Sequence, residues 1–294
     1  MNYNRITISV LLLFLSIHVG LAQQDPHFSL YKYNMNVINP AFAGVGEGAE
    51  VTFGARSQWT GIEDAPETYN FNANTPLNRG VGLGVSVIHD RVFVQSETNV
   101  YADFSYRIQL SNTADLYGGI KAGGTFFDAA LDELGLQNDP LFASNVNQFN
   151  PNFGVGLYLK ATHYFLTLSA PTLLKNERFL NEDDDLSTSG DTVHYFLGGG
   201  YNFYFRNRQW VFKPLVLLKV TAAAPLSLDI TPTMWFRENL EFGVNYRFGE
   251  SYTAFITTGI WNDKLRFGYA FENTTSRLQR FGGSSHEIVL KFSM

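Results

Sequence analysis

Acidic side chains form the densest group of potential metal ligands in this sequence. The run Asn181-Glu182-Asp183-Asp184-Asp185 supplies closely spaced oxygen atoms of the kind that calcium prefers. Neither a glycine turn nor a spaced bidentate glutamate follows it in the pattern of a calcium loop. The run therefore stands either as a calcium ligand set or as the solvated part of a loop.

Histidine is the other residue type that could bind a metal or act in catalysis. Five histidines follow the predicted leader peptide, namely His27, His89, His163, His194 and His286. No two of them have the i, i+4 spacing of a helical metal site, and the chain has no cysteine, so no metal site is predicted. His89-Asp90 could form part of a hydrolase triad, but no nucleophile elbow accompanies it. We expect no catalytic residue, no cofactor and no enzyme activity.

A two-residue alternation of apolar and polar side chains organises most of the chain from Glu50 onward. In the segment 101–110, Ala102, Phe104 and the next even-numbered residues are apolar. Asp103, Arg107 and the other odd-numbered residues are mostly polar. Successive side chains of a strand point to opposite faces, so this segment predicts a strand with one apolar face. A soluble sheet buries that face, whereas a transmembrane barrel turns it towards lipid and the polar face towards the lumen.

Strand number and length favour the transmembrane barrel. About fourteen alternating segments, mostly about 9 to 12 residues long, suit tilted strands that cross a bilayer, whereas soluble strands average about 5 to 6 residues. They lie at 50–58, 67–75, 80–90, 99–110, 115–126, 151–160, 163–170, 193–205, 210–220, 225–236, 240–248, 251–260, 264–272 and 284–294.

The predicted connections sort by side. Links after even-numbered strands are short, and all the long links follow odd-numbered strands: 127–150, 171–192 and 273–283. This is the pattern of outer-membrane barrels, which have short periplasmic turns and long extracellular loops. We therefore predict an all-β fold, a transmembrane antiparallel β-barrel of about 14 strands.

Composition agrees with an exported barrel. Arg5, an apolar stretch over 6–19 and Gly20-Leu21-Ala22 predict a signal peptide over residues 1–22. The hydrophobic share is 45%, but the mean hydropathy is only −0.09, because the apolar residues are dispersed. The net charge of −6, without a basic block, argues against a nucleic-acid partner.

The segment before the first strand has a different character. Residues 23–49 are rich in aromatic residues and asparagine and lack sustained alternation. We expect this segment to pack inside or at the mouth of the barrel formed by 50–294, the alternative being a flexible lead.

Several stretches of the sequence form a recognisable series. It begins with Gln24–Tyr31 and Asn39–Gly44 and ends with Gly283–Ile288. Between them lie Arg56–Gly61, Ala65-Pro66 with Asn74–Leu77, Pro151–Tyr158, and Lys213-Pro214 through Leu217–Lys219 to Ala224–Ser227. In this order the stretches resemble the PorP/SprF family of type IX secretion outer-membrane proteins. Leu30, Lys32 and the loop 177–192 depart from the family pattern.

The resemblance implies a role in protein traffic at the cell surface. Such proteins are barrels of the Bacteroidota outer membrane that work with type IX secretion, gliding motility and surface retention of large secreted proteins. Members similar to SprF receive and hold the C-terminal domain of a particular adhesin. The implied partners are that domain, other type IX secretion components and outer-membrane lipid. A diffusion channel or hydrophobic-solute transporter is the alternative that the barrel alone equally supports.

Two sets of residues carry specific expectations. In the wall, Phe104, Leu157 and Phe242 should face lipid, whereas Asp103, Arg107 and Arg247 should face the lumen, where substitutions should be tolerated. For the partner, the loops 127–150 and 171–192 are long enough to present a surface of about 800 Å², the alternative being that they fold over and close the pore. Apolar anchors and a steering acidic run are expected there, namely Phe142, Phe149, Leu173, Leu174, Phe179, Asp183, Asp184 and Asp185.

Overall fold

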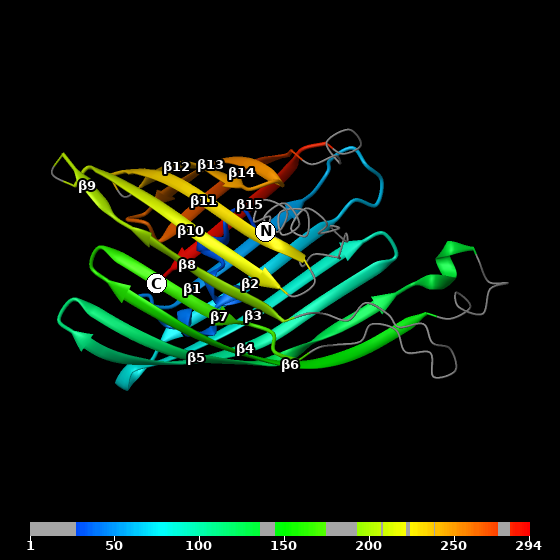
Figure 1. Ribbon diagram of the computed structural model, residues 1–294, viewed down its shortest axis with the longest axis horizontal. Coiled ribbons are helices and arrows are strands. Elements are labelled where there is room, and N and C mark those ends of the chain that lie inside the picture. Colours follow the sequence, from blue (N-terminus) through cyan, green and yellow to red (C-terminus); the bar gives the residue numbers. More distant parts are fainter. Residues whose placement is uncertain are drawn as a thin grey trace, which may run out of the picture.

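The computed structural model describes residues 28–135, 145–174, 193–206, 208–221, 224–237, 239–275 and 283–294. Within them the chain forms one continuous antiparallel sheet (Figure 1). Its strands are β1 (Glu50–Ser57), β2 (Glu67–Pro76), β3 (Val81–Val92), β4 (Gln95–Ser111), β5 (Ala114–Ala129), β6 (Val146–Ala161), β7 (Tyr164–Ala170), β8 (His194–Tyr201), β9 (Phe203–Phe205), β10 (Trp210–Thr221), β11 (Ala224–Phe236), β12 (Leu240–Arg247), β13 (Ser251–Ile260), β14 (Leu265–Thr274) and β15 (Ser285–Ser293).

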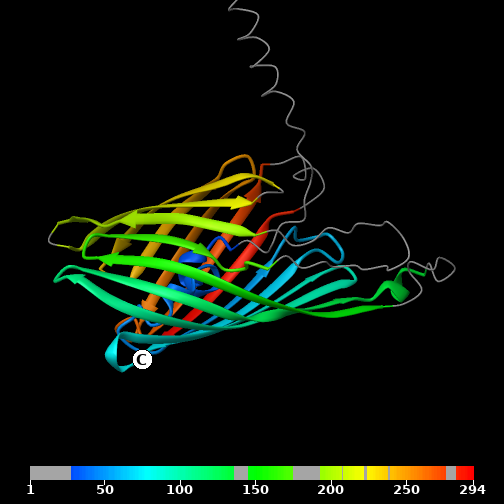
Figure 2. The same cartoon turned by 60° about the horizontal axis from the view of Figure 1, so that its bottom comes forward.

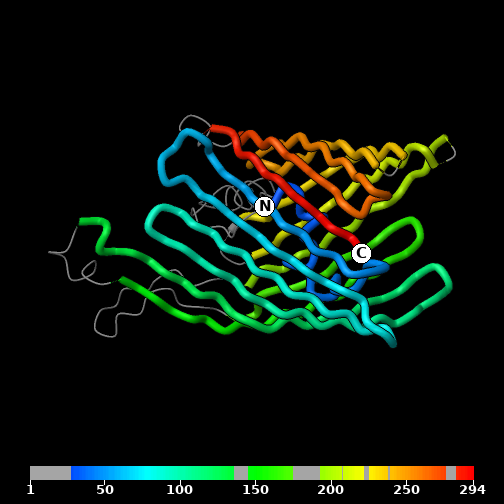
Figure 3. Tube along the Cα trace, turned by 180° about the vertical axis from the view of Figure 1, so that it is seen from behind, coloured from blue at the N-terminus to red at the C-terminus, as the bar shows by residue number. Residues whose placement is uncertain are grey.

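The sheet closes on itself. β1 pairs with β2 on one side and with β15 on the other, from Glu50↔Ser293 to Ser57↔His286. Figure 3 shows the last strand lying beside the first. β8 and β9 both pair with β10, so they are one wall strand interrupted at Asn202. The predicted barrel of about 14 strands is therefore confirmed.

Side chains divide between the two faces of the wall as the alternation predicts. Phe104, Leu157 and Phe242 lie on the outer face and are 43%, 48% and 43% exposed. Asp103 and Arg247 face inward and are buried. Arg107 shares the inward side of β4 with Asp103 by alternation, but it lies near the end of the strand and is exposed.

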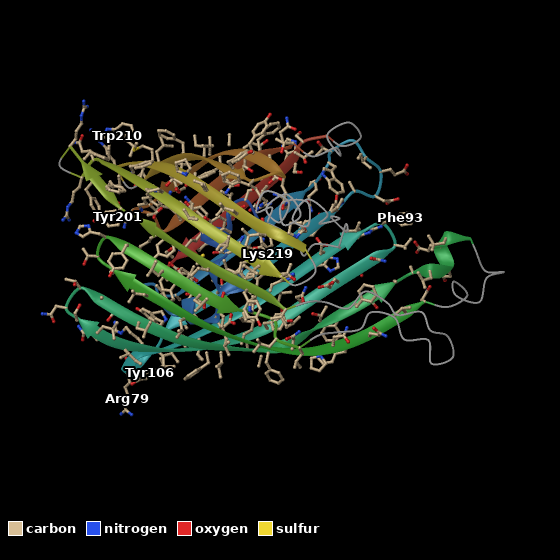
Figure 4. All side chains as sticks on the ribbon, viewed as in Figure 1. Arg79, Phe93, Tyr106, Tyr201, Trp210 and Lys219 are labelled. Atoms are coloured by element: carbon tan, nitrogen blue, oxygen red, sulfur yellow. The ribbon has the colours of Figure 1, made fainter. Side chains whose placement is uncertain are left out.

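The strands β4, β5 and β6 are longer than expected. They have 17, 16 and 16 residues and extend beyond the predicted segments at the end marked by Phe93 in Figure 4. The predicted link 91–98 is a tight hairpin at Phe93 and Val94, where Phe93 has a positive φ of 54°. The predicted loop 127–150 was too wide, because its flanks pair as strand from Phe127↔Gln148 to Ala129↔Val146. Polar residues in these extensions had weakened the alternation.

The connections lie at two ends of the barrel. Short turns at 77–80, 112–113, 162–163, 206–209, 237–239 and 261–264 share one end with the C-terminus, near Tyr201 and Trp210 in Figure 4. All the long connections lie at the other end, as predicted. By the rule for outer-membrane barrels, the end with short turns is periplasmic and the other end is extracellular.

Helical structure is confined to short pieces. They are η1 (Tyr31–Tyr33), α2 (Met35–Ile38), η2 (Pro40–Phe42), η3 (Asn78–Gly80) and η4 (Leu131–Leu134). No helix in the described part of the chain is long and apolar enough to cross a membrane. The first three pieces lie inside the barrel, where Figure 2 shows them surrounded by the wall. The predicted signal peptide, 1–22, lies outside the described residues.

Candidate functional site

Residues 28–45, which we call the plug, occupy the lumen and are anchored first at a buried ionic cluster. The Glu287 carboxylate accepts hydrogen bonds from the backbone N–H groups of Ser29 at 2.7 Å and Leu30 at 3.1 Å. The Arg56 guanidinium lies between Glu287 and Glu272, at 3.3 and 2.9 Å. The Ser29 hydroxyl donates to Glu272 at 2.7 Å. Breaking such a buried network leaves a charge unpaired, so the cluster fixes the start of the plug.

The next anchor joins η1 to β12 and β13. The Lys32 ammonium forms an ion pair with Glu241, whose side chain is fully buried. The Tyr33 hydroxyl donates to the same carboxylate and shares a hydrogen bond of 2.9 Å with Thr257. The plug therefore contributes charged and polar partners that the inward-facing carboxylate of Glu241 needs.

Asn39 ties the middle of the plug to the opposite wall. Its side-chain amide donates to the Leu157 carbonyl at 2.9 Å and to the Thr167 hydroxyl at 2.7 Å. Its side-chain oxygen accepts from the Ala41 N–H at 2.8 Å and so caps η2, which begins with proline. One asparagine thus both starts a helical turn and fixes it to β6 and β7.

Three inward-facing glycines on β3, β5 and β6 leave the space that the plug backbone fills. A β-carbon at Gly82 would lie 2.2 Å from the Ala43 carbonyl oxygen, and one at Gly119 would lie 2.2 Å from the Ala41 nitrogen. A β-carbon at Gly156 would lie 2.0 Å from the Asn39 side-chain oxygen. No real side chain fits at such distances, so glycine at these positions allows the plug to approach the wall.

A buried ion pair of the wall makes a further contact with the plug. The Lys121 ammonium lies 2.8 Å from the Asp103 carboxylate and donates to the Asn36 carbonyl at 3.0 Å. The side chains of Lys121 and Asp103 are 1% and 0% exposed. The lumen around Asp103 is therefore packed, which corrects the expectation of a wet lumen at this position.

Aromatic packing adds to the contacts between plug and wall. Phe42 of the plug meets Tyr158 of β6 edge to face, with ring centroids 5.3 Å apart, and Tyr158 also contacts Tyr117 of β5. Phe28, Tyr31 and Met35 belong to the same buried cluster. The main apolar core of the molecule therefore lies inside the barrel, between the plug and the wall.

Above the plug lies a vestibule that opens towards the extracellular end. Tyr31 and Ile38 contribute to its lining from the plug, and its cavity volume is about 130 Å³. Its wall includes Phe196, Tyr101, Glu97, Lys219, Asp229 and Arg247. The vestibule offers aromatic and charged contacts to a molecule that arrives from outside the cell.

Most charge in the vestibule is paired. Arg247 donates to both oxygens of Asp229, at 2.8 and 2.9 Å, in a bidentate arrangement. Burial raises the pKa of Glu250, in the turn beside Arg247, although the nearby guanidinium opposes that rise. Within the described ranges no group of three or more histidine, cysteine or acidic residues could hold a metal ion.

The structure places only some of the residues predicted to bind a partner. Phe149 lies on β6 rather than in a loop, where its ring packs on Phe126 with centroids 4.8 Å apart. Leu173 and Leu174 follow β7 and are 37% and 44% exposed. Phe142, Phe179, Asp183, Asp184 and Asp185, and with them the alternative calcium run, lie outside the described residues.

Asn152 is a structural residue that the sequence did not single out. Its side-chain oxygen accepts from the N–H groups of Leu173 at 2.9 Å and Leu174 at 3.0 Å, and its amide donates to the Leu174 carbonyl at 3.0 Å. It therefore fixes the start of the long loop to the inner face of β6. The available signals were an asparagine at an inward position and the neighbouring Gly154, which makes room for Pro171.

Residues 20–292 match the protein family described as Type IX secretion system membrane protein PorP/SprF. The chain belongs to the PorP/SprF family. The segments Asn39–Gly44 and Pro151–Tyr158, on which the resemblance partly rested, meet in this PorP/SprF barrel where Asn39 fills the space beside Gly156. No curated protein matches the sequence at a significant level.

Solved structures agree on the fold. The Acinetobacter baumannii outer membrane protein Omp33 is 9% identical, with a TM-score of 0.50 over 84% of this chain and 98% of that one. The CymD monoaromatic hydrocarbon channel is 11% identical, with a TM-score of 0.52 over 88% of this chain and 92% of that one. At such identities the likeness concerns the barrel alone. Together with the family, it locates this PorP/SprF protein in the outer membrane.

Proposed function

We propose that this PorP/SprF protein receives the C-terminal domain of a secreted surface protein and retains it at the cell surface. The observation that carries the proposal is the plug. Residues 28–45 fill the lumen through buried ion pairs, an asparagine clamp and close contacts at three glycines. A diffusion channel needs an open path, whereas a receptor can tolerate a closed floor beneath an open vestibule.

The extracellular end provides the surface for capture. The vestibule lies there, and the connections that follow β5 and β7 leave the wall at the same end. We propose that these loops supply apolar anchors at Phe142, Leu173, Leu174 and Phe179 and a steering charge at Asp183–Asp185. Phe149 would add an exposed aromatic side chain on the flank of β6. Aromatic and aliphatic anchors dominate binding energy, whereas charges mainly set the association rate.

Deletion of residues 177–190 tests the proposal. We expect the variant to remain a heat-stable barrel in the outer membrane, because no strand of the described wall includes these residues. Surface retention of the secreted protein that co-purifies with the wild type should be lost. A control replaces 177–190 by a glycine-serine linker of equal length, which keeps the connection but removes its side chains. Wild-type retention by the deletion strain contradicts the proposal.

A conductance measurement addresses the alternative channel function. Purified wild-type protein in planar bilayers should show no large steady current, because the plug blocks the lumen. A stable open current would favour a channel or solute transporter and would contradict the inference drawn from the plug.

A further inference from the structure

The barrel wall has a step between β6 and β7. β6 pairs with β5 along its whole length, from Ala129↔Val146 to Ala114↔Ala161. It pairs with β7 only between Val155↔Ala170 and Lys160↔Phe165. Residues 146–154 therefore continue past β7 for about 30 Å at the rise of an antiparallel strand, and Figure 1 shows this extension beside β5.

Backbone groups on alternate residues of this extension point away from β5. A β-carbon on Gly124 of β5 would lie 2.6 Å from the Asn150 carbonyl oxygen, so that carbonyl points towards β5. The Phe153 carbonyl instead accepts a hydrogen bond of 2.8 Å from Leu173, on the opposite side. Backbone groups alternate sides along a strand, so Asn147, Phe149 and Pro151 direct theirs to the side away from β5.

The lower part of this edge is covered by the chain itself. Leu173 bonds to Phe153, and Asn152 clamps the backbone of Leu173 and Leu174. Pro151 lies just above this clamp and has no N–H to offer. Among the described strands, none pairs with the side of residues 146–151 that faces away from β5. We call this stretch the β6 edge.

The β6 edge lacks the charged residues with which proteins usually block strand pairing. Its sequence, Val-Asn-Gln-Phe-Asn-Pro, contains no charge, and proline stands only at one end. The edge is also held in place from behind. Asn147 donates to Asp128 of β5 at 2.6 Å, and the rings of Phe149 and Phe126 pack together. Buried residues Phe127, Ala129 and Leu131 pack at the tip.

We propose that the β6 edge binds an extended strand of the retained secreted protein, antiparallel to β6, by β-augmentation. This inference rests on the proposed function and states how the partner is held. A preformed, uncharged strand edge recognises another backbone rather than a charged group, and alternate side chains such as Phe149 add apolar contact. The extracellular position of the edge makes it accessible to a domain delivered to the surface.

A pair of substitutions at Asn147 tests the backbone contact. Asn147→Pro and Asn147→Ala both remove the bond to Asp128, but only proline removes the N–H that faces the partner. We expect Asn147→Pro to weaken binding of the purified C-terminal domain of the co-purifying protein about tenfold relative to Asn147→Ala. Gln148→Pro is the control for folding, because its N–H faces β5 and its loss should disrupt the β5–β6 hairpin.

Hydrogen exchange gives a second, independent measurement. The backbone amides of Asn147 and Phe149 should exchange rapidly in the free barrel and slowly in the complex. Equal affinity of Asn147→Pro and Asn147→Ala would overturn the inference while leaving capture by the loops intact. Protection in the free monomer would show that the chain covers its own edge, and protection only in a dimer would identify a second copy as the occupant. If no secreted protein co-purifies with the wild type, both proposals fail.

Discussion

Neighbouring residues on one strand of this protein meet opposite surroundings. Phe104 points to the outside of the barrel and is 43% exposed, whereas Asp103 points inward and pairs with Lys121 at 2.8 Å. This contrast follows from the two-residue repeat of a strand. Substitutions at adjacent positions should therefore fail for different reasons, one through lipid and the other through an unpaired charge.

Phe104→Arg should destabilise the barrel by about 2–4 kcal/mol, because it places a cation against lipid. Arg107→Ala should change stability little, since Arg107 is exposed at the end of β4. Asp103→Ala should cost about 3–5 kcal/mol, because it leaves the Lys121 ammonium buried without a counter-charge. Urea unfolding of the variants in liposomes measures these differences. Stability of Phe104→Arg equal to that of Arg107→Ala would contradict the assignment of the outer face.

Sequence predicted the face of these residues but not their partners. Alternation is local, so the sides of Asp103, Phe104 and Arg247 could be read from the chain alone. The pairing of Asp103 with Lys121 depends on the cross-strand register of β4 and β5, where these residues are direct partners. The expectation of a wet lumen was wrong near Asp103, because the plug fills that space.

At the scale of elements, the plug packs closely on the wall where the wall has glycine. η2 packs against β5 and β6 because Gly119 and Gly156 present no β-carbon to it. Gly118, the neighbour of Gly119 on β5, faces outward, and a β-carbon there would approach Leu157 no closer than 3.9 Å. Two adjacent glycines therefore differ only in whether the plug lies against them.

Gly119→Ala should displace the plug, whereas Gly118→Ala should leave it in place. The new methyl group at position 119 would lie 2.2 Å from the Ala41 nitrogen, so the plug backbone must move. We expect Gly119→Ala to show a steady current in planar bilayers and faster proteolysis within 28–49. Both variants should keep the heat-stable barrel. If Gly119→Ala shows no current and the same proteolysis pattern as Gly118→Ala, the plug and the wall can adjust to the added methyl group.

Elements were more predictable where the apolar pattern was strong. Central strands such as β13 and β14 follow the predicted segments within two residues. The extensions of β5 and β6 were predicted as loop, because Asn147, Gln148 and Asn150 interrupt the alternation above the membrane. The path of the plug could not be predicted, since its partners Glu241 and Glu287 are more than 200 residues away along the chain.

At the scale of the whole molecule, the plug and the proposed capture surface occupy different regions. The plug packs in the lumen against inward-facing residues, whereas the vestibule and the β6 edge lie at the extracellular end. None of the residues proposed for capture in the loops belongs to the plug. Sealing and partner retention should therefore be separable by substitution.

Two variants measured side by side test this separation. The variant that lacks 177–190 should no longer retain the secreted protein at the surface. It should still show no current, because the plug remains in the lumen. Gly119→Ala should conduct and still retain the protein, because the extracellular surface is unchanged. Surface proteolysis of the retained protein and planar-bilayer recording give the two readouts on the same preparations. If Gly119→Ala loses retention together with the seal, the plug takes part in capture, and the floor of the vestibule belongs to the binding site.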